Sequence, residues 1–315
     1  IWDAIIYDHL RKQDIVGPTK TSHSKERTFT GAFVKEPISG FHDWVVSFDL
    51  NSLYPHLIMQ YNISPETIVG HNSDVDVDNL LSKEADLSDI HKKGYTVTPN
   101  GTIYRKDKRG FLPTLMEKIY ADRVVYKKKM LEAQQRKEEG EDTENEISKY
   151  LNIQMAKKIQ LNSAYGALGN QWFRYYDLRN SEAVTTGGQL AIRWIEKALN
   201  DYLNKYLETN DYDYVVAIDT DSVYLRLGKF VDKFIKSDNK NKICDLIDKV
   251  TREAFEPFIA KSYEELADYV NAYEQKMFMG REVIADKAVW TAKKRYALNV
   301  YDSEGVRYKK PKMKV

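Results

Sequence analysis

The chain has 315 residues, of which 42% are hydrophobic and 30% are charged, and its formal net charge is +1. Such a composition is ordinary for a globular protein with one large core or two to three modest domains. It excludes a disulfide framework, because Cys244 is the only cysteine, and it favours a reducing compartment. It also excludes a spanning helix, because no apolar stretch approaches the roughly 20 residues that a bilayer requires.

The first third of the chain predicts a helix, a linker and a buried strand. Apolar side chains fall at helical spacing in residues 1–12, whereas residues 17–28 are polar and contain turn formers. The apolar run 44–48 predicts a strand that ends at Asp49 and turns at once into a short helix. Residues 70–110 are polar and turn-rich, with a hairpin turn expected at Pro99-Asn100-Gly101.

Two long helices are expected next, from near Thr114 and near Thr143. Both openings have the Thr-x-x-Glu form of a capping box, and Gly140 supplies the break between the helices. A helix of about 25 residues is roughly 37 Å long, so the pair would project from the body of the protein.

The last part of the chain mixes helices with short strands. We expect helices at about 181–207 and 241–272, a hairpin turn at 219–222, and strands near 281–285 and 295–301. Because strands and helices follow no regular βαβ rhythm, the pattern predicts an α+β fold: an antiparallel sheet with packed helices, interrupted by a helical hairpin.

Three acidic residues at the ends of apolar strands are the first candidate site. Asp49 follows one strand, and Asp219 and Asp221 lie in the turn between two others. Carboxylates at such positions are costly unless they are paired or bind metal, and three of them could hold two divalent cations for phosphoryl transfer. The alternative is an ordinary Asp-rich hairpin turn, which the residues of the turn taken alone favour.

A second candidate site lies on the two long helices. Lys158, Asn162 and Tyr165 are spaced i, i+4 and i+7 and share one helix face, while Arg123 and Lys127 are spaced i, i+4 on the other helix. Cations facing each other from two helices could clamp a triphosphate. On spacing alone, two solvated basic faces are the favoured alternative.

Taken together, these segments resemble the family B DNA polymerases, most closely the replicative polymerases of T-even-like bacteriophages. Four motifs carry the family resemblance: Asp-Leu-Asn-Ser-Leu-Tyr-Pro at 49–55, the run 158–166, Asp-Thr-Asp-Ser at 219–222, and Lys-Lys-Arg-Tyr at 293–296. Three longer runs carry the phage likeness: 62–68, 165–170 and 172–180. The resemblance covers nearly the whole chain in the right order.

The resemblance implies roles for individual residues. Those implied to be catalytic are Asp49, Asp219, Asp221 and Lys158. Two Mg²⁺ ions, for which Mn²⁺ can substitute, would be held by Asp49, Leu50 through its carbonyl, Asp219 and Asp221. The residues implied to bind the dNTP are Leu50, Ser52, Leu53, Tyr54, Arg123, Lys127, Lys158, Asn162 and Tyr165. Among these, Tyr54 would exclude a ribose 2′-hydroxyl. The residues implied to bind DNA are Gly31, Tyr165, Gly166, Lys293, Lys294, Arg295 and Tyr296.

The resemblance also implies a domain plan. Residues 1–40 would be an N-terminal helix and linker, 41–110 the first part of the palm, 111–170 the fingers, and 171–315 the rest of the palm, ending at the thumb junction. An exonuclease domain and a thumb are not expected within this chain.

The implied function is a DNA-templated DNA polymerase core in phage replication, with primer–template DNA and dNTPs as partners, no membrane, and a location in the host cytoplasm. A second chain supplying exonuclease or thumb, and a sliding clamp, are left open. The alternative is a thumbless fragment that binds primer–template and is inactive without a partner chain. A metal-dependent nuclease is disfavoured because it does not need the triphosphate-clamping helices.

Three departures from the family pattern bear on these roles. His56 stands where a small Ser is usual, Ile218 replaces the usual Gly before Asp219, and the Gly-rich segment is reduced to residues 286–289. None of these changes removes an implied metal ligand.

Overall fold

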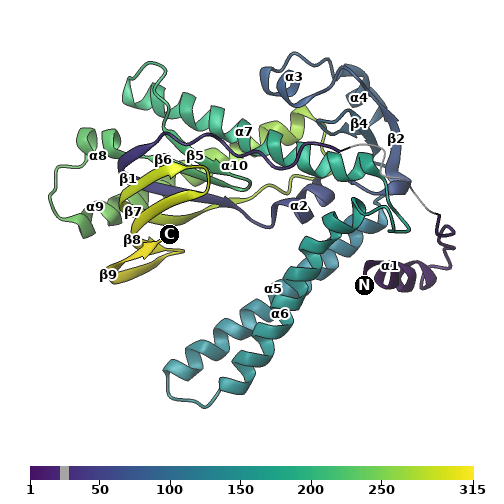
Figure 1. Ribbon diagram of the computed structural model, residues 1–315, viewed down its shortest axis with the longest axis horizontal. Coiled ribbons are helices and arrows are strands. Elements are labelled where there is room, and N and C mark those ends of the chain that lie inside the picture. The colour runs from purple at the N-terminus through teal and green to yellow at the C-terminus, as the bar shows by residue number, and fades with distance from the viewer. Residues whose placement is uncertain (22–27) are drawn as a thin grey trace.

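The computed structural model describes residues 1–21 and 28–315 and combines an antiparallel sheet with packed helices (Figure 1). The predicted α+β class is therefore confirmed. The main sheet has the spatial order β5–β6–β1–β7–β8–β9, and every neighbouring pair is antiparallel. Its strands are β1 (Gly40–Leu50), β5 (Val215–Asp219), β6 (Ser222–Arg226), β7 (Met279–Ala292), β8 (Arg295–Ser303) and β9 (Val306–Lys314).

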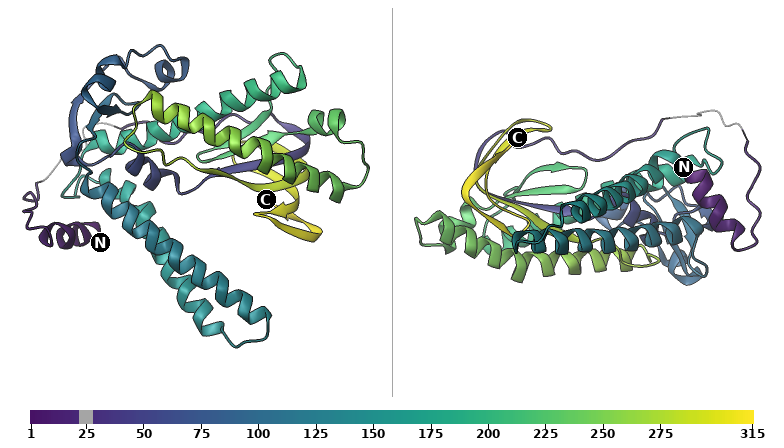
Figure 2. Two further views of the ribbon diagram at one scale, coloured as in Figure 1. Left: turned by 180° about the vertical axis from the view of Figure 1, so that it is seen from behind. Right: turned by 90° about the horizontal axis from the view of Figure 1, so that it is seen from below.

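Strand β1 lies inside the sheet, and alternate residues point to opposite faces. Val46, Phe48 and Leu50 join the large core shared with the helices, whereas Val45 belongs to a smaller cluster on the other face. The helices on the core side form one layer beneath the sheet (Figure 2). They are α7 (Leu178–Leu207), α8 (Gly228–Phe234), α9 (Lys240–Val250) and α10 (Glu256–Tyr269), with a π-helical turn at Thr251–Phe255. The second face is thus open near the catalytic candidates.

The C-terminal strands are longer than expected. The predicted strands 281–285 and 295–301 lie within β7 and β8, and the basic residues near the C-terminus form the additional strand β9. Lysine-rich sequence does not predict a strand by itself, but on an edge strand exposed lysines are common because they block pairing with other chains. The predicted helices at 181–207 and 241–272 are confirmed.

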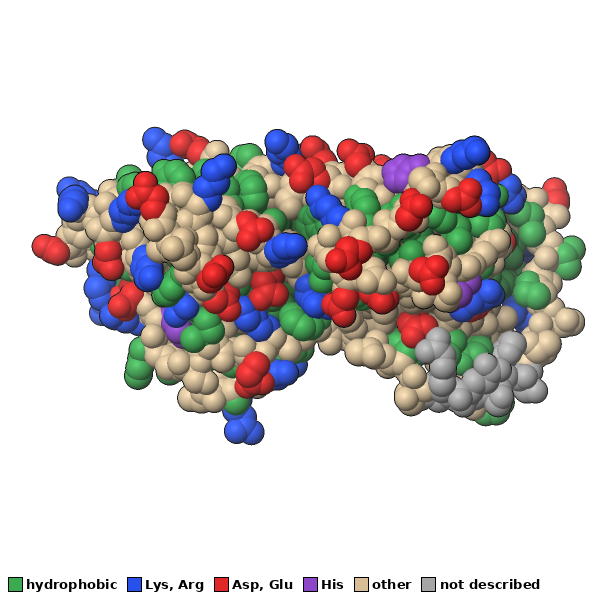
Figure 3. All heavy atoms as spheres, turned by 90° about the horizontal axis from the view of Figure 1, so that it is seen from above, with side chains coloured by type: hydrophobic (Ala, Val, Ile, Leu, Met, Phe, Trp, Pro, Cys, Tyr) green, Lys and Arg blue, Asp and Glu red, His purple; other side chains and the backbone are tan. Residues whose placement is uncertain are grey.

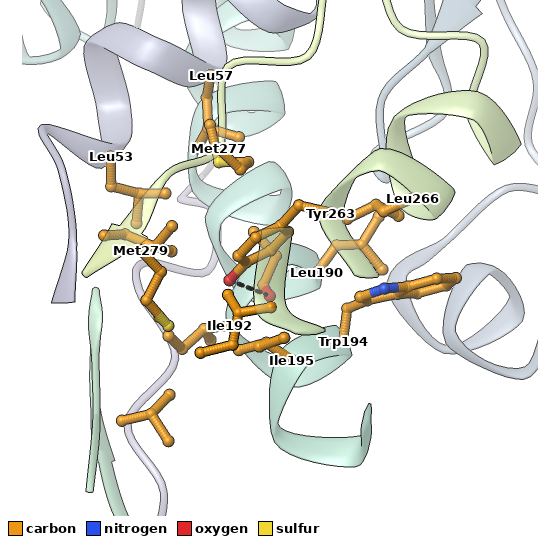
Figure 4. Packing of buried hydrophobic residues seen from close by; sticks show 14 of the residues in the cluster. Leu53, Leu57, Leu190, Ile192, Trp194, Ile195, Tyr263, Leu266, Met277 and Met279 are labelled. Carbon is orange, nitrogen blue, oxygen red and sulfur yellow. Dashed lines mark hydrogen bonds between the residues drawn. The ribbon is translucent and has the colours of Figure 1, made fainter. Parts of the chain in front are cut away.

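The short helix after Asp49 is α2 (Leu53–Gln60), and it packs tightly on α7. Figure 4 shows Leu53 and Leu57 of α2 near Leu190 of α7, Met277 before β7 and Met279 at the start of β7. A Cβ on Gly187 or Gly188 would lie 3.3 Å from a leucine methyl group of α2. The glycine pair thus allows the close approach that fixes the helix following Asp49.

The turn-rich segment forms a small three-stranded sheet of order β2–β4–β3 beside two short helices. The predicted hairpin turn at 99–101 is confirmed between β3 and β4, and Gly101 adopts φ +78° there. The two short helices were not expected. The elements of this segment are the 3₁₀ turn Pro65–Thr67, β2 (Ile68–His71), α3 (Val77–Ser82), α4 (Ser88–Lys93), β3 (Tyr95–Val97) and β4 (Thr102–Arg105).

The predicted N-terminal helix is α1 (Trp2–Arg11), which buries Trp2, Ile6 and Leu10. Of the predicted linker 17–28, residues 22–27 lie outside the described residues. Its described part contains no helix or strand.

The two long helices, α5 (Phe111–Glu138) and α6 (Glu144–Leu168), form a hairpin that projects from the body, as expected (Figure 1). The predicted capping boxes are wrong. Thr114 lies inside α5, where its hydroxyl donates to the Gly110 carbonyl, and the Thr143 hydroxyl donates to the Ala133 carbonyl. The first turn of α5 is capped from elsewhere: the Phe111 N–H donates to the Glu66 carboxylate at 2.6 Å. A cap supplied by tertiary contact leaves no signature within the helix sequence.

Charge is distributed in small, mixed groups. On the face in Figure 3 basic and acidic side chains alternate without a large area of one sign. Many of the basic residues are paired, for example Lys157 with Asp122 and Arg136 with Glu146. Among the described helices, none is both long enough and apolar enough to cross a membrane.

Candidate active site

The open end of the sheet and the base of the helical hairpin enclose a cavity of about 520 Å³. One wall comes from β1, the β5–β6 turn and the start of α2, and the other comes from α5 and α6. The residues lining it are Asp49, Leu50, Asn51, Ser52, Leu53, Tyr54, Arg123, Lys127, Lys158, Asn162, Tyr165, Thr220, Asp221 and Glu304. Both sequence-predicted constellations therefore contribute to one site.

Strand pairing brings Asp49 and Asp221 to the same wall. Asp49 of β1 is opposite Ser222 of β6, and the Ser222 hydroxyl donates to Asp49 Oδ2 at 2.7 Å. The Leu50 N–H donates to the Asp221 carbonyl at 2.9 Å. Thr220 adopts the left-handed φ of +61° in the two-residue turn, Thr220-Asp221, that joins β5 to β6. Backbone pairing, together with the Ser222 hydroxyl, thus positions these carboxylates.

Both carboxylates are destabilised in their charged form. Burial raises the pKa of Asp49, and the nearby Glu282 adds to the shift. Burial, together with the neighbouring Asp49, raises the pKa of Asp221 to about 6. Within residues 1–21 and 28–315, neither carboxylate has an ion-pair partner. A divalent cation between them would relieve this repulsion.

Asp219 is oriented differently. Its carboxylate is 2.5 Å from Lys294 Nζ, and its backbone forms a bridge with Val34. It does not line the cavity, and no group of three or more Asp, Glu, His or Cys side chains among the described residues is placed to hold a metal ion. Two carboxylates and the Leu50 carbonyl nevertheless form an all-oxygen donor set, which is what Mg²⁺ binds. These residues fit the expected metal, and Asp219 contributes only if Lys294 releases it.

The opposite wall carries cations without partners. Lys127 of α5 and Lys158 of α6 line the cavity, and within the part of the chain that the structure describes neither forms an ion pair. Their sequence neighbours differ: Lys157 pairs with Asp122 at 2.7 Å, and Lys128 lies 3.8 Å from Glu132. Of these four lysines, the two that form no ion pair with a described residue are therefore the two that line the cavity.

Arg123 connects the two walls. Its Nη1 donates to the Ser52 hydroxyl at 3.2 Å, while its buried Nε has no partner among the described residues. A buried N–H left unpaired is costly, so an anion that accepts from the Arg123 guanidinium would stabilise it. Asn162 lies beside Lys158 on the same face of α6, as the spacing predicts.

Two tyrosines meet at the floor of the cavity. The rings of Tyr54 and Tyr165 lie 4.8 Å apart at 47°. Burial raises the pKa of Tyr54 to about 12, so its hydroxyl stays protonated at neutral pH. Leu53 beside it is buried against Gly188. The Tyr54 ring therefore has packed surface behind it and cannot easily move away from a bound ligand.

The predicted DNA-contacting residues lie outside the cavity, except Tyr165. Lys294 bonds Asp219, Lys293 lies 3.5 Å from Glu36, and Tyr296 stacks near Trp290 with its ring 5.7 Å away. Arg295 is exposed. Gly31 and Gly166 are both exposed, and a Cβ on either would meet nothing within 4 Å. A surface from the β7–β8 turn to the Asp219 hairpin thus adjoins the cavity.

The family model for DNA polymerase family B matches residues 3–260. This chain belongs to DNA polymerase family B. The resemblance seen in the motifs is confirmed, and this family B chain is 38% identical over its whole length to the DNA-directed DNA polymerase of Escherichia phage RB69. It is 37% identical, also over its whole length, to the corresponding protein of Enterobacteria phage T4. DNA polymerase 1 of Pyrococcus abyssi is 32% identical over 62% of the chain and 21% of its own length.

The chain spans 40% of the length of each of the two phage relatives. The likeness to T-even-like phage sequences is confirmed over the whole of this chain.

Four residues of this family B site were not anticipated from sequence. Asn51 lines the cavity and donates to the Tyr120 hydroxyl, Thr220 lines it from the β5–β6 turn, Ser222 orients Asp49, and Glu304 reaches the cavity from the β8–β9 turn. Asn51 and Ser222 stand next to predicted residues, so their positions offered a signal. Glu304 had none, because only the pairing of β8 with β9 brings it there.

Proposed function

We propose that this chain catalyses the DNA-templated addition of a deoxynucleotide to a primer 3′ end. The observation that supports it is the pairing of two walls across one cavity: unpaired carboxylates on the sheet and unpaired cations on the helical hairpin. A nucleoside triphosphate with divalent cations has the charges needed to neutralise both walls at once.

In this proposal the hairpin binds the triphosphate. Arg123, Lys127 and Lys158 donate to its phosphate oxygens, and Asn162 lies within the same face. Because these cations lie opposite the carboxylates, charge that moves onto the departing pyrophosphate develops beside Lys158. Lys158 therefore stabilises the leaving group.

The carboxylate wall would hold two Mg²⁺ ions through Asp49, Asp221 and the Leu50 carbonyl, with Asp219 in support, and Mn²⁺ would substitute. When bound, the ions would stabilise the attacking and leaving oxygens of an in-line displacement. Ser222 keeps Asp49 aimed at the cavity. The Leu50 N–H holds the Asp221 backbone, so that both carboxylates keep their positions as substrate enters.

The floor and rim of the cavity would select substrate and bind DNA. Tyr54, with Ser52 and Leu53, supports the sugar and excludes a 2′-hydroxyl, and Tyr165 contacts the new base pair. Primer–template DNA would lie over the adjoining surface, which comprises Gly31, Gly166, Lys293, Lys294, Arg295 and Tyr296.

The domain plan follows the same division. The main sheet and its helices, 41–110 and 171–315, would be the palm, and the hairpin within 111–170 the fingers. Phage relatives support a role in phage DNA replication in the host cytoplasm. A sliding clamp, or a second chain that supplies exonuclease or thumb, stays a prediction.

The test is single-nucleotide extension of a labelled primer–template, at low salt and with excess protein, with each dNTP offered separately in Mg²⁺. We expect addition of the complementary nucleotide only, and a loss of about 10³-fold in Asp221→Ala. Asp268→Ala, which removes an exposed carboxylate of α10, is the matched control and should retain full activity.

Undiminished extension by folded Asp221→Ala would contradict the site. Absence of extension by the wild-type chain, with dNTP and primer–template binding verified in Mg²⁺ and in Mn²⁺, would contradict a self-sufficient polymerase and support the partner-dependent alternative. Shortening of the primer without dNTP would instead identify a nuclease.

A further inference from the structure

Two residues of α5 are bonded to the turn that follows Asp49. Arg123 Nη1 donates to the Ser52 hydroxyl, and that hydroxyl is in turn 3.3 Å from Asn51 Oδ1. Asn51 Nδ2 closes the ring by donating to the Tyr120 hydroxyl at 2.6 Å. Tyr120 and Arg123 are three residues apart on one face of α5. This ring of four side chains joins the helical hairpin to the catalytic strand.

His56 of α2 contacts two members of this ring, Ser52 and Tyr120. Its side chain is only 4% exposed, and Nδ1 donates to the Ser52 carbonyl at 3.0 Å. Its ring meets Tyr120 edge to face, at 4.6 Å and 83°. Burial lowers the pKa of His56, so the contact is between neutral rings at neutral pH. One histidine thus braces both the backbone of the turn and the aromatic side chain of the hairpin.

The turn needs such support. Ser52 has a φ of +48°, the left-handed region that a residue other than glycine occupies at a cost. Strained positions of this kind persist only where their surroundings over-determine them. Here the surroundings are His56 on one side and Tyr120 with Arg123 on the other.

The position of the ring gives it leverage over the hairpin. Tyr120 is near the base of α5, and about 18 further residues extend the helix by roughly 27 Å beyond it. Arg123 and Lys127 follow Tyr120 by one and two turns. A small change in the angle of α5 at Tyr120 therefore displaces the cations that face the carboxylate wall.

We propose that His56 is a positioning residue: with Tyr120 it forms a joint that sets the orientation of α5 and thereby the affinity for the nucleotide. The identity of the nucleotide ligand in this inference rests on the proposed function. The joint itself rests on the structure alone. The chemical step itself depends on the carboxylate wall. His56 does not contact that wall. The joint therefore acts on binding more than on chemistry.

The kinetic test separates KM for the dNTP from kcat. We expect His56→Ser to raise KM about tenfold with kcat within about twofold, because it removes binding common to ground and transition states. His56→Phe keeps the ring and should raise KM only about threefold. The double variant His56→Ser/Tyr120→Ala should raise KM by less than the product of the two single effects, since both substitutions remove the contact between His56 and Tyr120.

The chain provides a matched control in His42. It too is buried, bonds a backbone carbonyl (that of Ile38, at 2.7 Å) and lies edge-on to an aromatic ring (Trp290, at 5.9 Å), but it is on β1 away from the hairpin. His42→Ser should lower stability comparably and leave KM unchanged. Equal KM effects in the two serine variants, or additive effects of His56 and Tyr120, would overturn the joint.

A distance measurement tests the joint without catalysis. Spin labels on Asp142→Cys at the tip of the hairpin and Lys261→Cys on α10 report the orientation of α5, and Cys244 is fully buried and will not be labelled. His56→Ser should broaden or shift the distance distribution, and His42→Ser should not. If the distribution responds but the wild-type chain neither binds dNTP nor extends a primer, the joint stands and the proposed function fails. An unchanged distribution overturns the joint whatever the activity.

Discussion

The two walls of the cavity are built in opposite ways. The carboxylate wall belongs to a sheet in which β1 is paired on both sides, so that its residues are held by backbone hydrogen bonds. The cationic wall belongs to a hairpin that is attached to the body near its base and otherwise extends into solvent (Figures 1 and 2). Rigid placement suits groups that hold reacting atoms, and an adjustable arm suits groups that capture a diffusing ligand.

The walls also differ in what they lack. The carboxylate wall has half-buried negative charges that repel each other, whereas the cationic wall has exposed lysines that have no partner among the described residues. The carboxylate wall lacks cations and the cationic wall lacks an anion, so a triphosphate with its divalent cations would neutralise both walls. Breaking one wall should therefore affect ligand capture or chemistry without unfolding the protein.

Among substitutions on the hairpin, the largest loss of activity is expected at Lys158, and its neighbour Lys157 should show little loss. Lys158→Ala removes an unpaired cation that faces the carboxylates, and kcat/KM for dNTP addition should fall about 10²–10³-fold. Lys157→Ala is the matched control, because it removes the adjacent lysine that is already paired with Asp122. Steady-state extension kinetics would measure both. Similar losses in the two variants would mean that overall basicity, and not the cavity, governs activity.

Next in size is an effect on sugar selectivity. Tyr54 is packed between Tyr165 and Gly188 of α7, so its ring cannot yield to an extra hydroxyl. Tyr54→Ala should increase ribonucleotide incorporation relative to deoxynucleotide by about 10²-fold. Tyr54→Phe retains the ring and should keep the discrimination, as measured by competing rNTP and dNTP on one template. If the Ala variant still rejects rNTPs, another group excludes the 2′-hydroxyl.

Local sequence patterns predicted the residues within each wall better than the contacts that join distant segments of the chain. Regular spacing placed Lys158, Asn162 and Tyr165 on one helix face, because helix geometry depends on local sequence, although spacing alone favoured a solvated face. The strand exits revealed Asp49 and Asp221 for the same reason. Local patterns could not reveal the cap that Glu66 gives α5, or Glu304 at the cavity, since both depend on contacts between distant segments. Nor could they show that Asp219 would pair with Lys294, because that contact joins two separate hairpins.

A smaller effect concerns the stability of the metal-free carboxylate wall. The folded pKa of Asp221, about 6, is above its unfolded value of 3.8, so the folded state binds the proton more tightly. Stability is therefore highest below pH 3.8 with respect to this group and is lost as the pH rises to about 6. Asp221→Asn should stabilise the metal-free protein at pH 8 by about 1–2 kcal/mol. This free energy is smaller than the pKa shift alone implies, because solvent screens the partly exposed carboxylate.

Thermal unfolding with chelator, at pH 5 and pH 8, would measure this effect. The advantage of Asp221→Asn should fall to about half at pH 5, which lies between the unfolded and folded pKa values, and added Mg²⁺ should raise the Tm of the wild type more than that of the variant. Asp268→Asn should show neither dependence. A variant less stable than wild type at pH 8 would mean that the Asp221 carboxylate makes a favourable contact that outweighs its burial.

The smallest effect is expected at the base of the hairpin, where Glu66 accepts from the first N–H of α5. Glu66→Ala should weaken that end of the helix by about 0.5–1 kcal/mol, the range for loss of a capping carboxylate. Asp76→Ala is the matched control, because Asp76 caps α3 through the Asn79 N–H at 2.8 Å. Hydrogen exchange should speed up at residues 111–114 in the first variant and at 77–80 in the second, with β1 unchanged in both. Faster exchange in β1 of Glu66→Ala would mean that the arm and the sheet unfold together, and the contrast between a rigid wall and an adjustable one would fail.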